Sequence, residues 1–209
     1  MTLVTSGPPA RARGTSKLPK EQREQLILDA ATDEFGAMGY AGASLGQIAD
    51  RVGVSKALVL TYFGSKEALY TACADRAGAN LIPRIEQVIT TRHSIGDMAV
   101  ATLDAIFTGL EQRPHDWNVL NDRTVPAGSS AAATTKQMRR TIAEQAGRGV
   151  QSLVRHSLDD PDDVSVLTDV WMGTVTAVVN WWLRHPDRTA AEMSARCGRI
   201  LRAIAGAPP

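Results

Sequence analysis

Cysteine is nearly absent from this chain, which has only Cys73 and Cys197 among its 209 residues. Two thiols provide neither a disulfide framework nor a four-ligand zinc site. Each lies in a helical apolar pattern, so we expect both to be small buried side chains. None of the four histidines stands at metal-ligand spacing from another, and no metal site is predicted.

Long apolar runs are also absent. No run approaches the roughly 20 residues that span a bilayer, and the segment from Met1 to Gly14 lacks the apolar region of a signal peptide. We therefore expect a cytoplasmic protein without a membrane partner. Catalytic signatures are missing too, since no glycine-rich phosphate loop follows a strand pattern and neither cysteine lies in a nucleophile motif. No catalytic residue and no cofactor is predicted.

The net charge of +1 gives no reason by itself to expect a nucleic-acid partner, but the charge is unevenly distributed. The first 23 residues are rich in Gly, Pro, Ser and Thr and hold one acid, Glu21, against Arg11, Arg13, Lys17, Lys20 and Arg23. We interpret residues 1–18 as a flexible basic arm. It is either a solvated tail or a contact to the minor groove of DNA.

Helical periodicity begins after Pro19, with apolar residues at three- and four-residue steps up to Met38, where Gly39 can close the helix. Ser44 and Gln47 have capping-box spacing and predict a short second helix that ends at Gly53. Ser55 can cap a third helix that ends at Gly64. Two short helices joined by such a turn form a helix-turn-helix, which we place in a domain of residues 19–64.

The remainder, residues 65–209, predicts a larger helical domain. Ser65 can cap a fourth helix, Pro83 interrupts the pattern beyond it, and residues 126–133 have the composition of a loop. Further amphipathic stretches run over residues 95–112, 115–123, 134–156, 163–184 and 189–205. The fold class is therefore all-α, with about nine helices and no sheet.

The segment from Ser44 to Tyr70 resembles the DNA-binding signature of the tetracycline-repressor (TetR) family. The resemblance includes Ile48-Ala49, Gly53-Val54-Ser55, Tyr62-Phe63 and the run from Ser65 to Leu69. It covers about the first third of the chain. It implies a homodimer that binds a double-stranded DNA operator through the N-terminal domain, and an unknown small-molecule effector through a helical ligand-binding and dimerisation domain.

The resemblance makes the third helix the reading helix, which enters the major groove. If Val54, Val59 and Phe63 face the core, then Lys56, Leu58, Leu60, Thr61 and Tyr62 face outward. Ser44 and Lys66 stand at helix starts, which favour phosphate. The predicted DNA-binding residues are Ser44, Gln47, Ser55, Lys56, Leu60, Thr61, Tyr62 and Lys66. For Ser44 and Ser55 the alternative is a capping role alone, and Leu60 stands where the family usually has tyrosine.

All four tryptophans lie in the second domain, together with several large apolar residues. Such residues at helical spacing are either core or the lining of a ligand pocket. With the family resemblance, we predict a pocket lined by Phe107, Trp117, Met138 and Trp171, with Asn121 or Asp122 as a polar orienting group.

The last two helices carry small and apolar residues on faces that need a partner. Because these helices form the dimer interface in the TetR family, the resemblance implies an interface of Val166, Val170, Gly173, Ala177, Ala191, Ala195 and Gly198. The chain is then expected to be a homodimeric repressor that binds a palindromic operator and is released by a small apolar effector. The alternatives are a helical DNA-binding regulator without such an effector and an all-helical cofactor-binding enzyme.

Overall fold

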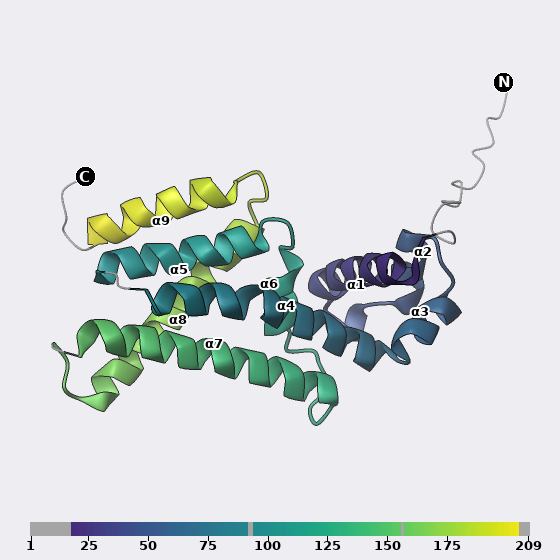
Figure 1. Cartoon of the computed structure of the whole chain (residues 1–209), viewed down its shortest axis with the longest axis horizontal. Helices are drawn as coiled ribbons and strands as arrows, with labels where there is room; N and C mark the ends of the chain where they lie inside the picture. Colours follow the sequence, from purple (N-terminus) through teal and green to yellow (C-terminus); the bar gives the residue numbers. More distant parts are fainter. Residues whose placement is uncertain (1–17, 92–93, 156, 205–209) are drawn as a thin grey trace, which may run out of the picture.

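The computed structural model describes residues 18–91, 94–155 and 157–204. Within these ranges the chain forms nine α-helices and no strand, as the sequence predicts (Figure 1). The helices are α1 (Lys20–Gly42), α2 (Leu45–Val52), α3 (Lys56–Phe63), α4 (Lys66–Ile89), α5 (Ile95–Leu110), α6 (His115–Asn121), α7 (Ser130–Val154), α8 (Pro161–Leu183) and α9 (Ala190–Ile204). In this part of the chain no helix combines the length and the apolarity that a membrane crossing needs. The predicted basic arm lies outside the described residues, apart from Leu18.

The ends of the first helices are set by local interactions that the sequence predicts. The Ser55 hydroxyl accepts a hydrogen bond from the Leu58 amide at 3.1 Å, which caps α3. Gly53 ends α2 in the left-handed region with φ 68° and ψ 33°. Gly39 also has φ 68°, as expected, but α1 resumes beyond it and ends at Gly42. The helix-turn-helix is therefore built from capping residues and left-handed glycines.

The capping box predicted for Ser44 and Gln47 is wrong. The Ser44 hydroxyl does cap α2, but its backbone amide donates to Glu34 Oε1 at 3.2 Å. Glu34 comes from α1, is 1% exposed, and also pairs with Arg51 at 3.3 Å. A buried carboxylate from α1 thus takes the place of the predicted glutamine and ties α2 to α1.

Helices α1, α2 and α3 share a small core with the N-terminal half of α4. Ile27, Phe35, Ile48 and Val59 are buried in it. Tyr70 of α4 meets the Phe35 ring edge-on, with ring centroids 4.9 Å apart. Because α2 and α3 have eight residues each, this packing on α1 and α4 provides most of their stability.

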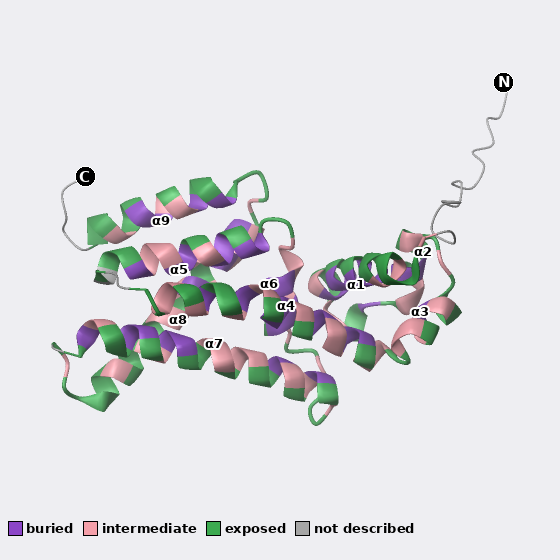
Figure 2. Cartoon of the chain, in the orientation of Figure 1, coloured by how far each residue is buried: buried purple, intermediate pink, exposed green. Residues whose placement is uncertain are grey.

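The C-terminal half of α4 enters a second core, shared with α5 to α9. In Figure 1, α5, α4 and α7 lie in successive rows and α8 crosses behind them. Along these helices buried positions alternate with exposed ones (Figure 2), and the buried residues pack together in one cluster. Cys73 and Cys197 are buried and unbonded to each other, as predicted. Burial raises the pKa of the Cys73 thiol to about 11, so this side chain stays protonated.

Two predicted helix boundaries are wrong. Pro83 was expected to interrupt the helical pattern, yet α4 continues through it to Ile89. A proline removes one backbone donor, and packing of α4 against α5 and α7 offsets this local cost. The second boundary concerns α7, which begins at Ser130 inside the predicted loop because Ser129 accepts from the Ala132 amide at 3.1 Å.

Candidate nucleic-acid interface and internal cavity

Helix α3 presents one face to solvent. Lys56, Ala57 and Thr61 are exposed on it, and Leu58 and Leu60 are half-buried. The Thr61 hydroxyl donates to the Ala57 carbonyl at 2.9 Å, which leaves it acceptor capacity for an outside partner. This face therefore offers one ammonium group, one hydroxyl oxygen and apolar side chains.

Tyr62 was expected on this outward surface, but its ring packs against the N-terminal core. Three residues separate it from the buried Val59, so both side chains share the inner face of α3. The Tyr62 hydroxyl accepts a hydrogen bond from Arg23 of α1 at 3.0 Å. The sequence analysis missed this contact between residues 39 positions apart, for which no local pattern exists.

The other predicted DNA-binding residues border this face. Ser44 and Ser55 are exposed and act as caps, and Gln47 is exposed on α2. Lys66 is more constrained, because its ammonium donates to the Ala43 carbonyl at 2.7 Å and lies 4.9 Å from the centre of the Tyr40 ring. In this conformation Lys66 braces the start of α4 against the segment between α1 and α2.

A partly enclosed cavity of about 140 Å³ lies among α4, α5, α6, α7 and α8. Each helix contributes to its wall: α4 through Ile85, α5 through Met98, α6 through Trp117, α7 through Val150 and α8 through Trp171. Within residues 18–91, 94–155 and 157–204, no aspartate, glutamate, lysine, arginine or histidine lines it. The space is therefore suited to an uncharged and mainly apolar guest.

Two of the predicted pocket residues, Trp117 and Trp171, line this cavity, and the others lie elsewhere. Phe107 is fully buried and packs edge-on against Trp182, with ring centroids 5.1 Å apart. Met138 packs closely against α4. A Cβ atom added to Gly78 of α4 would lie 2.4 Å from the Met138 sulfur.

The candidate orienting groups also have other partners. Asn121 donates to the Trp117 carbonyl at 2.9 Å within α6. Asp122 accepts from the Tyr40 amide of α1 at 2.6 Å. The polar side chain that does line the cavity is Thr102 of α5, which the sequence analysis missed because its pattern does not separate a core-facing position from a cavity-facing one.

Helix α6 connects the cavity to the N-terminal domain. Trp117 lines the cavity, while the side-chain amide of the neighbouring Asn118 donates to the Gly36 carbonyl of α1 at 3.1 Å. Just beyond α6, Asp122 holds α1 as described, and Thr124 Oγ1 accepts from the Ala41 amide at 3.2 Å. A displacement of α6 would therefore act directly on α1.

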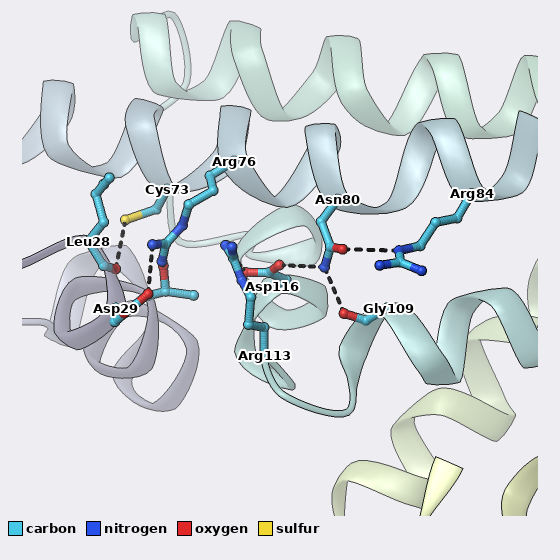
Figure 3. Close-up of polar contacts among 10 residues, drawn as sticks. Leu28, Asp29, Cys73, Arg76, Asn80, Arg84, Gly109, Arg113 and Asp116 are labelled. Atoms are coloured by element: carbon cyan, nitrogen blue, oxygen red, sulfur yellow. Dashed lines mark hydrogen bonds and ion pairs between the residues drawn. The ribbon is translucent and has the colours of Figure 1, made fainter. Parts of the chain in front are cut away.

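A polar network holds α4 in the same region (Figure 3). Asp116 of α6 has no exposed surface, and it accepts from Asn80 of α4 at 3.0 Å and from Arg113 at 3.0 Å. Nearer the start of α4, Arg76 pairs with Asp29 of α1 at 2.7 Å. Helix α4 is thus bonded both to the N-terminal domain and to the segment that carries α6.

Most of the predicted dimer residues are exposed in the single chain. They are Val166, Val170, Gly173 and Ala177 of α8 and Ala191 and Ala195 of α9. Gly198 differs, since it is buried within its own subunit, where an added Cβ would meet Val100 at 3.8 Å.

Comparison with known proteins identifies the N-terminal domain. Residues 27–73 match the family model of bacterial regulatory proteins of the tetR family. The HTH-type transcriptional activator FasR of Mycolicibacterium smegmatis is 30% identical over 124 residues, which cover 59% of this chain and 57% of FasR. The match thus spans little more than half of that relative.

The whole fold is also similar to solved structures. A TetR-like transcriptional regulator from Rhodococcus sp. RHA1 has a TM-score of 0.69 at 21% identity, covering 91% of this chain and all of that one. FadR from Bacillus subtilis, in complex with stearoyl-CoA, has a TM-score of 0.65 at 16% identity, covering 85% of this chain and 96% of that one.

FasR and the two solved proteins are named as regulators of transcription. Residues 27–73 therefore carry the signature of the tetR family of bacterial regulatory proteins, and the described residues have the all-helical fold of the solved regulators.

Proposed function

We propose that the chain is a ligand-responsive repressor that binds a palindromic operator as a homodimer and is released by a small apolar effector. The observation that carries this proposal is the position of α6, which lines the cavity through Trp117 and bonds to α1 through Asn118. One short helix thereby touches both the space for an effector and the domain that carries the reading helix.

DNA recognition follows from the exposed face of α3. In the proposed complex this helix lies in the major groove, where Lys56 and Thr61 reach base edges and Leu60 contacts thymine methyl groups. Ser44, Ser55, Gln47 and Lys66 lie at the border, where they position the domain on phosphates. A two-fold dimer places its two α3 helices on half-sites about one helical turn, or a small multiple, apart.

Dimerisation is proposed to cover the exposed apolar face of α8 and α9. Val166 and Val170 are 63% and 59% exposed in the single chain, which is unfavourable for a face of this kind in water. Ala177→Arg on that face should produce monomers in sedimentation at micromolar concentration, because a buried unpaired charge costs several kcal/mol. Ala133→Arg, at an exposed position of α7, is the matched control. Equal dimerisation of both variants would refute this interface.

The effector is proposed to occupy the cavity and to shift α6 and α4. A tenfold loss of operator affinity needs about 1.4 kcal/mol of coupling, so modest differences in contact between the two conformations are sufficient. The likeness to FadR, which was solved with stearoyl-CoA, supports the binding of a small-molecule ligand by a helical body of this kind.

Repression is the proposed direction of control, because a dimer bound to an operator within a promoter prevents RNA polymerase from binding there. FasR is named an activator, so the direction needs its own test. A reporter downstream of the operator should become more active when the gene for this chain is deleted. A fall in reporter activity would show activation.

The effector site is tested with an operator selected from genomic fragments by the purified chain. A series of alkanols and monocyclic aromatic compounds is screened for release of the complex, with fluorescence anisotropy of the labelled operator as the readout. Trp117→Ala should lose the response and keep operator affinity, whereas Trp182→Phe, outside the cavity, should keep both. A series in which no compound changes operator affinity would instead support a regulator without a small-molecule effector.

A further inference from the structure

Thr102 stands out among the residues that line the cavity. It lies on α5, is 7% exposed, and contributes the one hydroxyl group of the lining. Among the described residues its hydroxyl forms no hydrogen bond, and its oxygen is not one of the fully buried side-chain atoms that lack a partner. A hydroxyl that the chain leaves without a partner can donate a hydrogen bond to, and accept one from, a molecule that enters the cavity.

Several other helical threonines in the described part of the chain satisfy their hydroxyls internally. Thr61, Thr135 and Thr168 each donate to the carbonyl four residues earlier. Thr135 is the closest comparison, because it is 1% exposed and its hydroxyl lies 3.1 Å from the Ala131 carbonyl oxygen. Thr102 is nearly as deeply buried and lacks this bond, so its hydroxyl remains available to a molecule in the cavity.

The rest of the cavity offers little else that is polar. The indole N–H of Trp117 already donates to Asn180 at 3.1 Å, and the other lining tryptophan, Trp171, is only half-buried. Among the residues that the structure describes, no charged side chain lines the space. A carboxylate or an ammonium group would therefore lose its hydration there without gaining a partner of opposite charge.

We propose that the effector is an uncharged, mainly apolar molecule whose single hydrogen-bonding oxygen, as in a phenol, alcohol or ketone, binds the Thr102 hydroxyl. This inference rests on the proposed function, which places the effector in the same cavity. The volume of about 140 Å³ is close to the roughly 150 Å³ of a dry cavity that holds benzene. A single aromatic ring therefore fits this conformation, and phenol and toluene form a matched pair of probes that differ only in hydroxyl against methyl.

Calorimetry on the full chain compares the two probes. Thr102→Val keeps the shape of the side chain and should raise the dissociation constant of phenol by about 2- to 12-fold, the effect of one neutral hydrogen bond. The dissociation constant of toluene should stay constant or fall, and Thr102→Ser should retain the binding of phenol. Equal changes for both probes would overturn the role of Thr102 while leaving the effector cavity intact. Failure of both probes to bind would overturn the cavity and this inference together.

Thermal unfolding of the ligand-free chain supplies a second readout. Thr102→Val should leave the melting temperature unchanged or raise it, because it removes a buried polar group that has no partner. Thr135→Val, which removes an internally bonded hydroxyl, should lower it by about 2–4 °C. A loss at position 102 as large as that at position 135 would show that the Thr102 hydroxyl serves the folded chain, and would overturn the proposal.

Discussion

Asp122→Ala is the most informative single change at the junction between the two domains. The Asp122 carboxylate follows α6 and accepts from the Tyr40 amide of α1 at 2.6 Å. It also accepts from the Thr124 amide at 2.7 Å and from the Thr124 hydroxyl at 2.8 Å. Thr124 Oγ1 in turn accepts a hydrogen bond from the Ala41 amide. The substitution therefore removes one hydrogen-bond acceptor for the amides of α1 and destabilises a second.

The loss of stability can be worked out from these bonds. Hydrogen bonds to a charged group contribute about 1.5–3 kcal/mol each, and the surroundings of Asp122 are only partly buried. We therefore expect the free energy of unfolding to fall by about 2–3 kcal/mol in total. For a chain of this length, this corresponds to a melting temperature lower by about 4–12 °C.

The functional consequence is measured as operator affinity with and without an effector. If α6 transmits its displacement to α1 through these bonds, Asp122→Ala should keep operator affinity well below the melting temperature and respond more weakly to the effector. Asp75→Ala, at an exposed position of α4, is the control and should change neither quantity. A variant that loses stability but keeps the full response would refute this route of coupling. Unchanged stability would refute the assigned strength of the bonds.

Four further predictions concern the DNA-binding domain and its attachment. Lys66→Ala should weaken binding to every DNA sequence and lower the slope of log affinity against log salt by about one, since a phosphate contact releases one counterion. Lys56→Ala should instead cost about 1–3 kcal/mol on the cognate site and relax its preference there, so an equal factor on cognate and scrambled DNA for both variants would contradict the division of roles. Glu34→Ala should lower the free energy of unfolding by about 2–3 kcal/mol, because the start of α2 loses a buried acceptor. Glu34→Gln, which keeps an acceptor, should cost less in the same denaturant titration, and equal losses would count against this contact. Hydrogen bonds from the Ser130 hydroxyl and amide lower the pKa of Glu67 from its ordinary value of 4.5. The stability that they contribute is complete above that value and is lost as the pH falls through the lower, folded-state pKa, so unfolding at pH 7 and pH 3 should show a smaller acid loss for Glu67→Gln than for the natural chain. The same acid loss in both proteins would contradict this assignment.

The helix-turn-helix could be predicted from the sequence because its determinants are local. The Ser55 hydroxyl caps α3 by accepting a hydrogen bond from the amide of Leu58, only three residues later. Gly53 takes a backbone conformation that other residues rarely adopt. Short-range chemistry of this kind is visible in the order of the residues. The capping of α2 could be predicted only in part. The Ser44 hydroxyl bonds within its own helix start, but the Ser44 amide donates to Glu34, which comes from another helix.

The cavity could not be predicted with the same success. Trp117 and Phe107 both lie at helical spacing among apolar neighbours, yet one lines the cavity and the other packs against Trp182. The difference depends on how far each helix is rotated about its axis, which is decided by packing between helices distant in sequence. Continuation of α4 through Pro83 depends on tertiary packing in the same way.

The bonds from α6 and its following segment to α1 have a consequence for engineering. On the α1 side the groups are the Gly36 carbonyl and the Tyr40 and Ala41 amides, all of which belong to the main chain. Gly36 alone is restricted in identity, because an added Cβ would come within 2.5 Å of the His115 side chain. A DNA-reading domain from another regulator should therefore accept the same body if it keeps this glycine together with the Asp29 and Phe35 side chains that contact α4, so that operator and effector preferences can be recombined as separate modules.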